Sequence, residues 1–407
     1  MIRKVIIPIL FIIFTLLSCA DPEAGSDVPE FFNAKEVSAG LFFTAAIKSD
    51  GTLWTWGSNE VGLLGIGSNR LSSIIPIKIG DEKWKAVSIK CFHIAAIKND
   101  DTLWAWGYNP FGQLGVGDIT NHTSPVKVDE PEGGIHGPWI VVSAGGFHTA
   151  AIKSDGTLWA WGDNSSGQLG DGSPTQRRTP VQVKQLVDSV LVIFDDVEAV
   201  STGYEHTVAI KRDGSLYAWG YNVSGLLGVG DTTNHHTSPV KVDEPEGGIH
   251  GKWIAVSAGR NCTLAIKADG TLWAWGSNTY GQLGLGDKGQ RISPEQVGAD
   301  RDWEAVSAGL GESGGSKYYT LATKTDGTLW AWGDNTYGQL GLGDTVQRTR
   351  PVKVGDKWKA VSAGALHAAA IRKDGVLWAW GNNNFGQLGD ATNIDKSIPA
   401  RVILSDW

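Results

Sequence analysis

Residues 269–287, DGTLWAWGSNTYGQLGLGD, carry the pattern that decides the fold. The central Trp-x-Trp-Gly element recurs along the chain, starting at Trp54, Trp104, Trp159, Trp273, Trp330 and Trp378, with a variant at Tyr217. Successive copies are 50, 55, 58, 56, 57 and 48 residues apart, which makes seven copies of one unit. A period of this size is typical of repeat architectures, in which a unit buries its apolar surface against its neighbours.

Each unit predicts one small antiparallel sheet. Four short β-rich runs separated by turn residues surround the element: Val-Ser-Ala-Gly, an Ala-Ala-Ile-Lys-like run, Leu-Trp-Ala-Trp and Pro-Val-Lys-Val. Asp-Gly pairs such as Asp269-Gly270 supply the positive backbone angles of a tight hairpin. The second unit has Asp100-Asp101 instead, which predicts a small strain. The Leu-Trp-Ala-Trp strand is apolar on both faces, so each sheet needs a neighbour on both sides.

The expected fold is all-β, a seven-bladed β-propeller of four-stranded antiparallel blades with the ring closed by pairing of N- and C-terminal strands. The first unit begins at Lys35 without a leading Trp and without its own Pro-Val-Lys-Val strand. The chain ends with Pro399–Val402 and Trp407, which match those two pieces. We therefore expect the last strand to complete the first blade.

The N-terminus has the features of an export signal. Arg3 and Lys4 precede an apolar run, Val5–Leu17, which is too short to span a bilayer; a buried strand is the alternative. Leu16-Leu17-Ser18-Cys19 resembles the lipobox of bacterial lipoproteins, in which the cysteine is lipidated, although Leu17 departs from the commonest residue there. We expect a signal peptide at residues 1–18, a flexible tether at 19–33 with lipidated Cys19, and the propeller at 34–407. The expected location is the bacterial cell envelope, periplasmic or surface-exposed.

Composition restricts the partners. Lys and Arg number 35 against 43 Asp and Glu, so the formal net charge is -8, which disfavours a nucleic-acid partner held by phosphate neutralisation. With 41% apolar residues and 19% charged residues, the chain has ample material for a buried core. We expect a monomer that is bound to the membrane only through its lipid.

Three elements of the unit, Ala-Gly-x-x-His-Thr, Asp-Gly-x-Leu-Trp-Ala-Trp-Gly and Asn-x-x-Gly-Gln-Leu-Gly, resemble the regulator of chromosome condensation repeat. The resemblance covers residues 35–407 and implies a seven-bladed propeller that acts as an interaction platform. One type of secreted bacterial relative inhibits β-lactamases, so inhibition of an extracellular or periplasmic enzyme is an alternative. Exchange activity on a small GTPase, the activity of the nuclear namesake, is disfavoured because an exported lipoprotein does not meet that substrate.

The residue types that could bind a ligand or a metal ion fit structural roles better than functional ones. The tryptophans occupy one strand position in every unit, which favours packing over sugar stacking. His93, His148, His206 and His367 share one repeat position, which Phe43, Cys262 and Tyr319 fill in the other units; this predicts structural hydrogen bonds and no metal site. Cys91 and Cys262 belong to different blades, so no disulfide is expected.

No enzyme chemistry is apparent in the repeat. The Gly-rich loop Asn278–Asp287 follows a strand but precedes no helix, so its glycines are expected to serve tight turns and not to bind phosphate. No catalytic pair stands out, and we expect a non-enzymatic protein without cofactor or metal. A carbohydrate-active or other hydrolase propeller is a further alternative.

Three long connections, residues 129–138, 184–198 and 243–252, join successive blades. They follow the fourth strand of a unit, so we expect them side by side on the face that carries the Asp-Gly hairpins. There they form an acidic crescent with exposed apolar residues, among them Val190–Phe194, that binds a protein or another envelope macromolecule. The candidate residues are Asp129, Glu130, Glu132, Ile135, His136, Asp188, Asp195, Asp196, Asp243, Glu244, Glu246, Ile249 and His250. Alternatively, the loops are merely tolerated there, and Val190–Phe194 packs where the fourth unit lacks its leading Trp.

Overall fold

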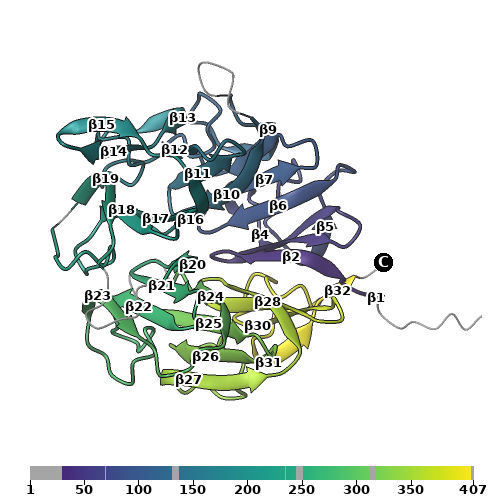
Figure 1. The fold of residues 1–407 in the computed structure, drawn as a ribbon. Helices are drawn as coiled ribbons and strands as arrows, with labels where there is room; N and C mark the ends of the chain where they lie inside the picture. The colour runs from purple at the N-terminus through teal and green to yellow at the C-terminus, as the bar shows by residue number, and fades with distance from the viewer. Residues whose placement is uncertain are drawn as a thin grey trace, which may run out of the picture.

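Seven four-stranded antiparallel sheets follow one another along the chain and form a ring (Figure 1). The computed structural model describes residues 30–68, 70–130, 137–233, 235–243, 251–311 and 317–404. Within each sheet the strand order is the sequence order, which confirms the predicted propeller of four-stranded antiparallel blades. Across the described ranges, no helix has the length and apolarity needed to cross a membrane.

The strands occupy equivalent positions in the seven blades. The innermost strands are β2 (Ala34–Ala39), β6 (Trp84–Ile89), β10 (Trp139–Ala144), β16 (Val197–Thr202), β20 (Trp253–Ala258), β24 (Trp303–Ala308) and β28 (Trp358–Ala363). The second strands are β3 (Phe43–Lys48), β7 (His93–Lys98), β11 (His148–Lys153), β17 (His206–Lys211), β21 (Cys262–Lys267), β25 (Tyr319–Lys324) and β29 (His367–Arg372). The third strands are β4 (Leu53–Ser58), β8 (Leu103–Gly107), β12 (Leu158–Gly162), β18 (Leu216–Tyr221), β22 (Leu272–Gly276), β26 (Leu329–Gly333) and β30 (Leu377–Gly381). The outer strands are β5 (Ser72–Lys78), β9 (His122–Lys127), β13 (Arg177–Gln182), β19 (His235–Lys241), β23 (Arg291–Gln296), β27 (Arg348–Gly355) and β31 (Lys396–Arg401).

Four further strands and one turn complete the described structure. β14 (Lys184–Val187) pairs with β15 (Val190–Ile193), and β1 (Glu30–Phe31) pairs with β32 (Ile403–Leu404). A 3-10 turn, η1 (Glu60–Gly62), follows β4.

The Asp-Gly turn joins the second and third strands, as the sequence predicts. In the fifth blade Gly270 has φ of 78°, and Asp269 Oδ1 accepts hydrogen bonds from the Thr271 amide at 3.1 Å and hydroxyl at 2.7 Å. These bonds to the carboxylate lower the pKa of Asp269. Asp101 takes the glycine's place in the second blade and adopts φ of 68°, so the predicted backbone strain is present.

Tryptophan forms the core between blades. The second Trp of each motif is completely buried, and its indole N–H donates to a backbone carbonyl of the preceding blade. In the fifth blade Trp275 donates to Leu226 O at 2.8 Å and packs edge-on against Trp253, the leading Trp, with ring centroids 6.2 Å apart. The packing role predicted for the tryptophans is confirmed for these residues.

The first and fourth blades have phenylalanine where the others have a leading Trp. Ala34 and Val197 occupy the Trp position in sequence, but a phenylalanine two or three residues upstream supplies the ring. Phe32 lies 5.7 Å from Trp56, and Phe194 lies 5.8 Å from Trp219, both completely buried. The fourth blade therefore does fill its missing Trp position, with Phe194 alone.

The seventh and first blades meet through the same bonds as the other neighbouring blades. Each innermost strand contacts the next, and β28 contacts β2. Ser362 Oγ accepts from the Ala39 amide at 2.9 Å, as Ser88 Oγ accepts from the Ala144 amide at 2.9 Å between the second and third blades. The Trp56 indole donates to Gln387 O at 2.9 Å across this junction. The ring is therefore closed.

The expectation that the last strand completes the first blade is wrong. The first blade has its own outer strand, β5, and β31 pairs with β30 in the seventh blade. Pro76-Ile77-Lys78-Ile79 is the first unit's version of Pro-Val-Lys-Val, so each blade forms from contiguous chain, which needs only short loops to close. The terminal pairing is instead the separate β1–β32 ladder. Residues 30–33, assigned to the tether by sequence, belong to the fold, because Phe32 is buried and Asn33 bridges Val376. Trp407, Cys19 and the signal peptide lie outside the described residues.

Candidate functional site

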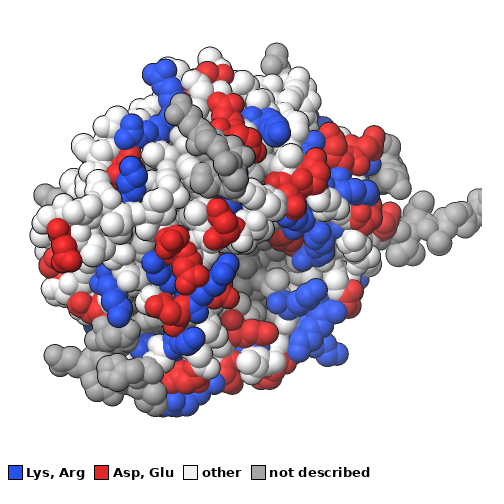
Figure 2. All heavy atoms as spheres, turned by 45° about the horizontal axis from the view of Figure 1, so that its top comes forward, with Lys and Arg blue, Asp and Glu red and all other residues white. Residues whose placement is uncertain are grey.

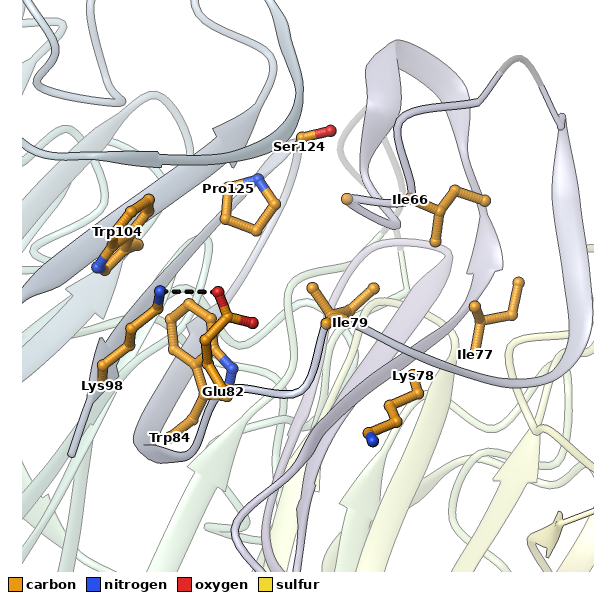
Figure 3. Close-up of a pocket in the computed structure, with 12 residues that line it drawn as sticks. Ile66, Ile77, Lys78, Ile79, Glu82, Trp84, Lys98, Trp104, Ser124 and Pro125 are labelled. Atoms are coloured by element: carbon orange, nitrogen blue, oxygen red, sulfur yellow. Dashed lines mark hydrogen bonds and ion pairs between the residues drawn. The ribbon is translucent and has the colours of Figure 1, made fainter.

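A cation lies over at least one aromatic ring at the same position in every blade. Lys98 Nζ is 3.8 Å from the ring centroid of Trp104 and 5.1 Å from that of Trp84, and it pairs with Glu82 at 3.2 Å (Figure 3). The equivalent cations are Lys48, Lys98, Lys153, Lys211, Lys267, Lys324 and Arg372, the last residues of the second strands. Cation–π contacts of this kind stabilise desolvated cations. These cation–π contacts were not predicted from the sequence, although a basic residue recurs at one position of every unit.

Two of the candidate acidic residues serve these structural cations. Glu130 Oε2 accepts from Lys153 Nζ at 2.8 Å, and Asp195 Oδ1 lies 4.0 Å from Lys211 Nζ. Asp196 pairs with Arg212 at 3.6 Å. These carboxylates are therefore partly neutralised by the fold, and the crescent carries less free negative charge than the sequence suggests.

Open pockets lie between adjacent blades at the rim. The first has a volume of about 430 Å³ between the first and second blades, and Ile66, Ile77, Ile79, Trp84 and Trp104 give it an apolar lining (Figure 3). A second pocket of about 640 Å³ occupies the equivalent place one blade further on. Its lining residues are Asp129, Glu130, Trp159, Arg177, Thr179, Pro180, Val181, Gln182 and Lys184. The second pocket thus brings two crescent residues against the start of β14.

The connection at residues 184–198 folds into an exposed aliphatic hairpin, which we call the rim hairpin (residues 184–193). In its two-stranded ladder Leu186 faces Leu191 and Val187 faces Val190. Six of its aliphatic side chains are exposed: Leu186, Val187, Val190, Leu191, Val192 and Ile193, between 41% and 61%. β14 lies beside β19, and the ladder contains no third strand. The alternative that this whole run packs in the core is therefore wrong for Val190–Ile193.

The remaining candidate residues are only partly brought together. Asp188 lies in the turn of the rim hairpin with φ of 47°, and Asp129 lines the second pocket. Asp243, one connection further on, accepts from Ser293 Oγ at 3.2 Å. The other candidates, Glu132, Ile135, His136, Glu244, Glu246, Ile249 and His250, lie outside the described residues.

The four repeat-position histidines are structural, as predicted. Each is completely buried, and its Nε2 meets a threonine hydroxyl of the next blade, as in His206–Thr263 at 3.1 Å and His367–Thr44 at 2.9 Å. Burial lowers the pKa of His206 and His367 to about 3, so both rings are neutral. Among the described residues, no group of three or more His, Cys, Asp or Glu side chains is placed to hold a metal ion.

The cysteines and glycine loops also have structural roles. Cys91 and Cys262 are buried free thiols, and burial raises the pKa of each to about 12, which keeps both protonated and unreactive. Gly284, in the Gly-rich loop Asn278–Asp287, has φ of 77°, and a Cβ there would lie 2.8 Å from the Trp332 indole nitrogen. The loop glycines therefore serve tight turns and close packing, as expected.

Charges of both signs are mixed on one face of the molecule. On the face shown in Figure 2, Asp and Glu side chains alternate with Lys and Arg side chains. The rim hairpin contrasts with this pattern because six of its eight exposed residues are aliphatic and only Asp188 is charged.

Three family models match the sequence, one of the RCC1-like domain and two of the RCC1 repeat. The RCC1-like domain matches residues 19–254, and the regulator of chromosome condensation (RCC1) repeat matches residues 269–313, 326–371 and 374–406. The ultraviolet-B receptor UVR8 of Arabidopsis thaliana is 30% identical over 322 residues, which are 77% of this chain and 68% of the receptor. The human E3 ubiquitin-protein ligase HERC2 is 33% identical over 204 residues, but these are 50% of this chain and only 4% of the ligase.

Solved structures share the fold. Human WBSCR16 superposes with a TM-score of 0.73 and 22% identity, covering 87% of this chain and 94% of that one. Yeast RCC1 (Prp20), solved bound to Kap60, gives a TM-score of 0.72 at 19% identity, covering 98% of this chain and 92% of that one. These similarities show a common propeller architecture.

Proposed function

Because the chain belongs to the RCC1-like family of seven-bladed propellers, we propose that it is a lipid-anchored, non-enzymatic scaffold of the bacterial cell envelope that binds another protein through the rim hairpin. The observation that carries the proposal is the cluster of six exposed aliphatic side chains on β14 and β15. Monomeric proteins seldom expose contiguous apolar surface of this kind unless it contacts a partner.

The rim hairpin suits a polypeptide partner. Among the strands that the structure describes, β15 pairs with β14 alone, so its other edge is available to an added strand. Such pairing would cover Val190 and Val192, which are 61% and 41% exposed. The second pocket, which shares Lys184 with the hairpin, offers an adjacent depression for a partner side chain.

Relatives of the same fold support protein as the class of partner. One yeast RCC1 structure is a complex with Kap60, and another study of the same yeast protein describes its binding to Gsp1p and histones. The partners themselves differ from any that an envelope protein would meet, so the support concerns the scaffold role alone.

The lipid anchor rests on the N-terminal sequence. Cys19 follows an apolar run preceded by Arg3 and Lys4, and two or more acyl chains give stable anchoring where a single chain does not. Replacement of Cys19 by alanine is expected to move the protein from the membrane fraction to the soluble fraction and to abolish labelling with a radioactive fatty acid. Unchanged membrane association of C19A would contradict the anchor while leaving the binding role intact.

Binding is tested by charging the rim hairpin. The double variant V190K/V192K places two lysines on one face of β15, and we expect it to lose the partner that the wild-type protein captures from envelope extract. V346K is the matched control, because Val346 is 59% exposed on a connection of the sixth blade. Both variants should keep the wild-type thermal midpoint. If V190K/V192K still captures every partner of the wild-type protein, the proposed binding surface is wrong.

A further inference from the structure

Five aromatic rings form a continuous cluster on the face where the Gly-x-x-His turns emerge. Phe147 is its centre and lies 5.8 Å from Phe92, 6.3 Å from Tyr108, 5.2 Å from Phe111 and 5.4 Å from Tyr204. All five side chains are half-buried. They come from the second, third and fourth blades, and we call them the aromatic cluster.

The propeller repeat does not require aromatic residues at these turns. The two residues that precede the repeat position differ as a pair from blade to blade, although the second of them is phenylalanine in the first three blades. Where both are described, the pairs are Leu41-Phe42, Cys91-Phe92, Gly146-Phe147, Tyr204-Glu205, Arg260-Asn261 and Ala365-Leu366. Their neighbours vary less: the residue before each pair is a glycine except for Lys90, and four blades have a histidine after it that bonds the next blade, as His148 bonds Thr207. Positions that vary while the frame is kept are where repeat proteins place binding residues.

An arginine without an ion-pair partner lies beside the cluster. The Arg260 guanidinium stacks 3.8 Å from the ring centroid of Tyr204, and no salt bridge joins it to a described carboxylate. Glu205 acts on it only at longer range, and burial raises the pKa of that carboxyl. The guanidinium has five N–H donors in a rigid fork, and stacking fixes its plane, so several donors remain for a ligand.

A second cation lies beneath this position. Lys90 replaces the turn glycine of the other blades and extends from the second blade to carbonyls of the fourth and fifth. Its Nζ donates to Ala258 O at 2.5 Å and to Thr202 O. Ala258 ends β20, two residues before Arg260, so Lys90 holds the strand from which Arg260 projects and adds positive charge near it.

We propose that Arg260 and the aromatic cluster form a second protein-binding site, whose ligand is a polypeptide segment with a carboxylate side chain next to an apolar one. Arginine and tyrosine are enriched in the energetic centres of protein interfaces, and phenylalanine is enriched in interfaces as a whole. A carboxylate matches the two-pronged donor geometry of guanidinium, and the rings offer apolar contact beside it. The site is independent of the rim hairpin, which belongs to a different connection.

The probe is a library of random dodecapeptides displayed on phage and selected against the whole protein. Selected peptides are expected to share Asp or Glu next to an aliphatic or aromatic residue. A synthetic peptide of the selected sequence should bind R260Q at least about tenfold more weakly than the wild type, and its Asp→Asn or Glu→Gln analogue should show a comparable loss. R260K keeps the positive charge but lacks the forked donors of guanidinium, so its affinity for the peptide should lie between those of R260Q and the wild type.

Matched controls separate this site from the rest of the surface. R301Q removes an arginine that pairs with Asp269 at an Asp-Gly turn, and V190K/V192K alters the rim hairpin; both should bind the peptide as the wild type does. Y204L should weaken binding as R260Q does, which keeps the test valid if R260Q lowers the thermal midpoint. The proposal is overturned if no peptide is selected, if the selected peptides lack an acidic residue, or if R260Q and Y204L bind them with wild-type affinity.

Discussion

Buried histidines explain both a packing rule and a sensitivity to acid. The repeat uses histidine because Nε2 reaches the threonine hydroxyl of the next blade, as His93 reaches Thr149. That hydroxyl in turn donates to a carbonyl of the histidine's own blade, Gln113 O. The other ring nitrogen, Nδ1, has no hydrogen-bond partner in His93, His148, His206 or His367. Protonation would place a charge in an apolar site, which is why burial lowers the pKa of these rings.

The direction of the pKa shift predicts how stability depends on pH. The folded rings have a pKa of about 3 in His93, His206 and His367, against 6.5 when unfolded, so below pH 6.5 the unfolded chain binds more protons. The free energy of unfolding should fall as pH drops from 6.5 to 5, by up to about 1.4 kcal/mol per pH unit for each histidine. Urea denaturation at several pH values measures this slope.

A single replacement makes the test specific. H206F introduces phenylalanine, the residue that the first blade already has at this position as Phe43. It should reduce the slope of unfolding free energy against pH by roughly one quarter, because it removes one of four equivalent rings. H235F, at an exposed histidine, is the control and should keep the wild-type slope. A slope that H206F leaves unchanged would show that the buried rings do not control acid unfolding.

The turn between the second and third strands of the second blade holds backbone strain that a substitution can relieve. Asp101 holds φ of 68°, a conformation that costs a non-glycine residue about 1 kcal/mol, and its ion pair with Lys85 is partly exposed and contributes little. D101G should therefore raise the free energy of unfolding by roughly 0.5–1 kcal/mol in urea denaturation.

The neighbouring position gives the control. Asp100 Oδ1 accepts from the Thr102 amide at 3.0 Å and hydroxyl at 2.6 Å, so D100G should destabilise the protein by about 1 kcal/mol. If D101G destabilises the protein as D100G does, the strain assigned to this turn is wrong.

The strands were predictable from sequence, and some of what packs on them was not. Leu-Trp-Ala-Trp favours a strand and Asp-Gly favours a tight turn, and both preferences are local, so these motifs predict the blades and their hairpins. Phe32 was not predicted to replace the leading Trp, because it lies two residues before the Trp position and a change in chain path moves its ring into place. Val190–Phe194 was considered both as an exposed apolar run and as a run packed at the missing Trp position, and each reading holds for part of it: Phe194 is buried and Val190–Ile193 are exposed.

The candidate site could be predicted in outline. The three connections were identified from their length, and the structure gives one of them an exposed apolar ladder. The charge of the crescent was overestimated because the sequence does not show that Glu130 and Asp195 pair with Lys153 and Lys211. The aromatic cluster was not predicted, since its rings meet only when the second, third and fourth blades are assembled.

The whole molecule depends on closure of the ring. Sequence predicted closure by the terminal strands, and the structure adds β1–β32 to a junction that already repeats the contacts of the other six. The outer strand of the first blade was assigned to the wrong end of the chain because Pro76–Ile79 has isoleucine at both valine positions of Pro-Val-Lys-Val, although its pattern is the same.

A matched pair of threonines tests closure most directly. Thr44 bonds His367 at 2.9 Å across the junction of the seventh and first blades, and Thr207 bonds His148 at 2.9 Å between the third and fourth. In a closed ring T44V and T207V leave the same buried groups unpaired, so each should lower the free energy of unfolding by the same amount, about 1–3 kcal/mol, in urea denaturation. A loss for T207V with none for T44V would show that the first and seventh blades do not meet in solution.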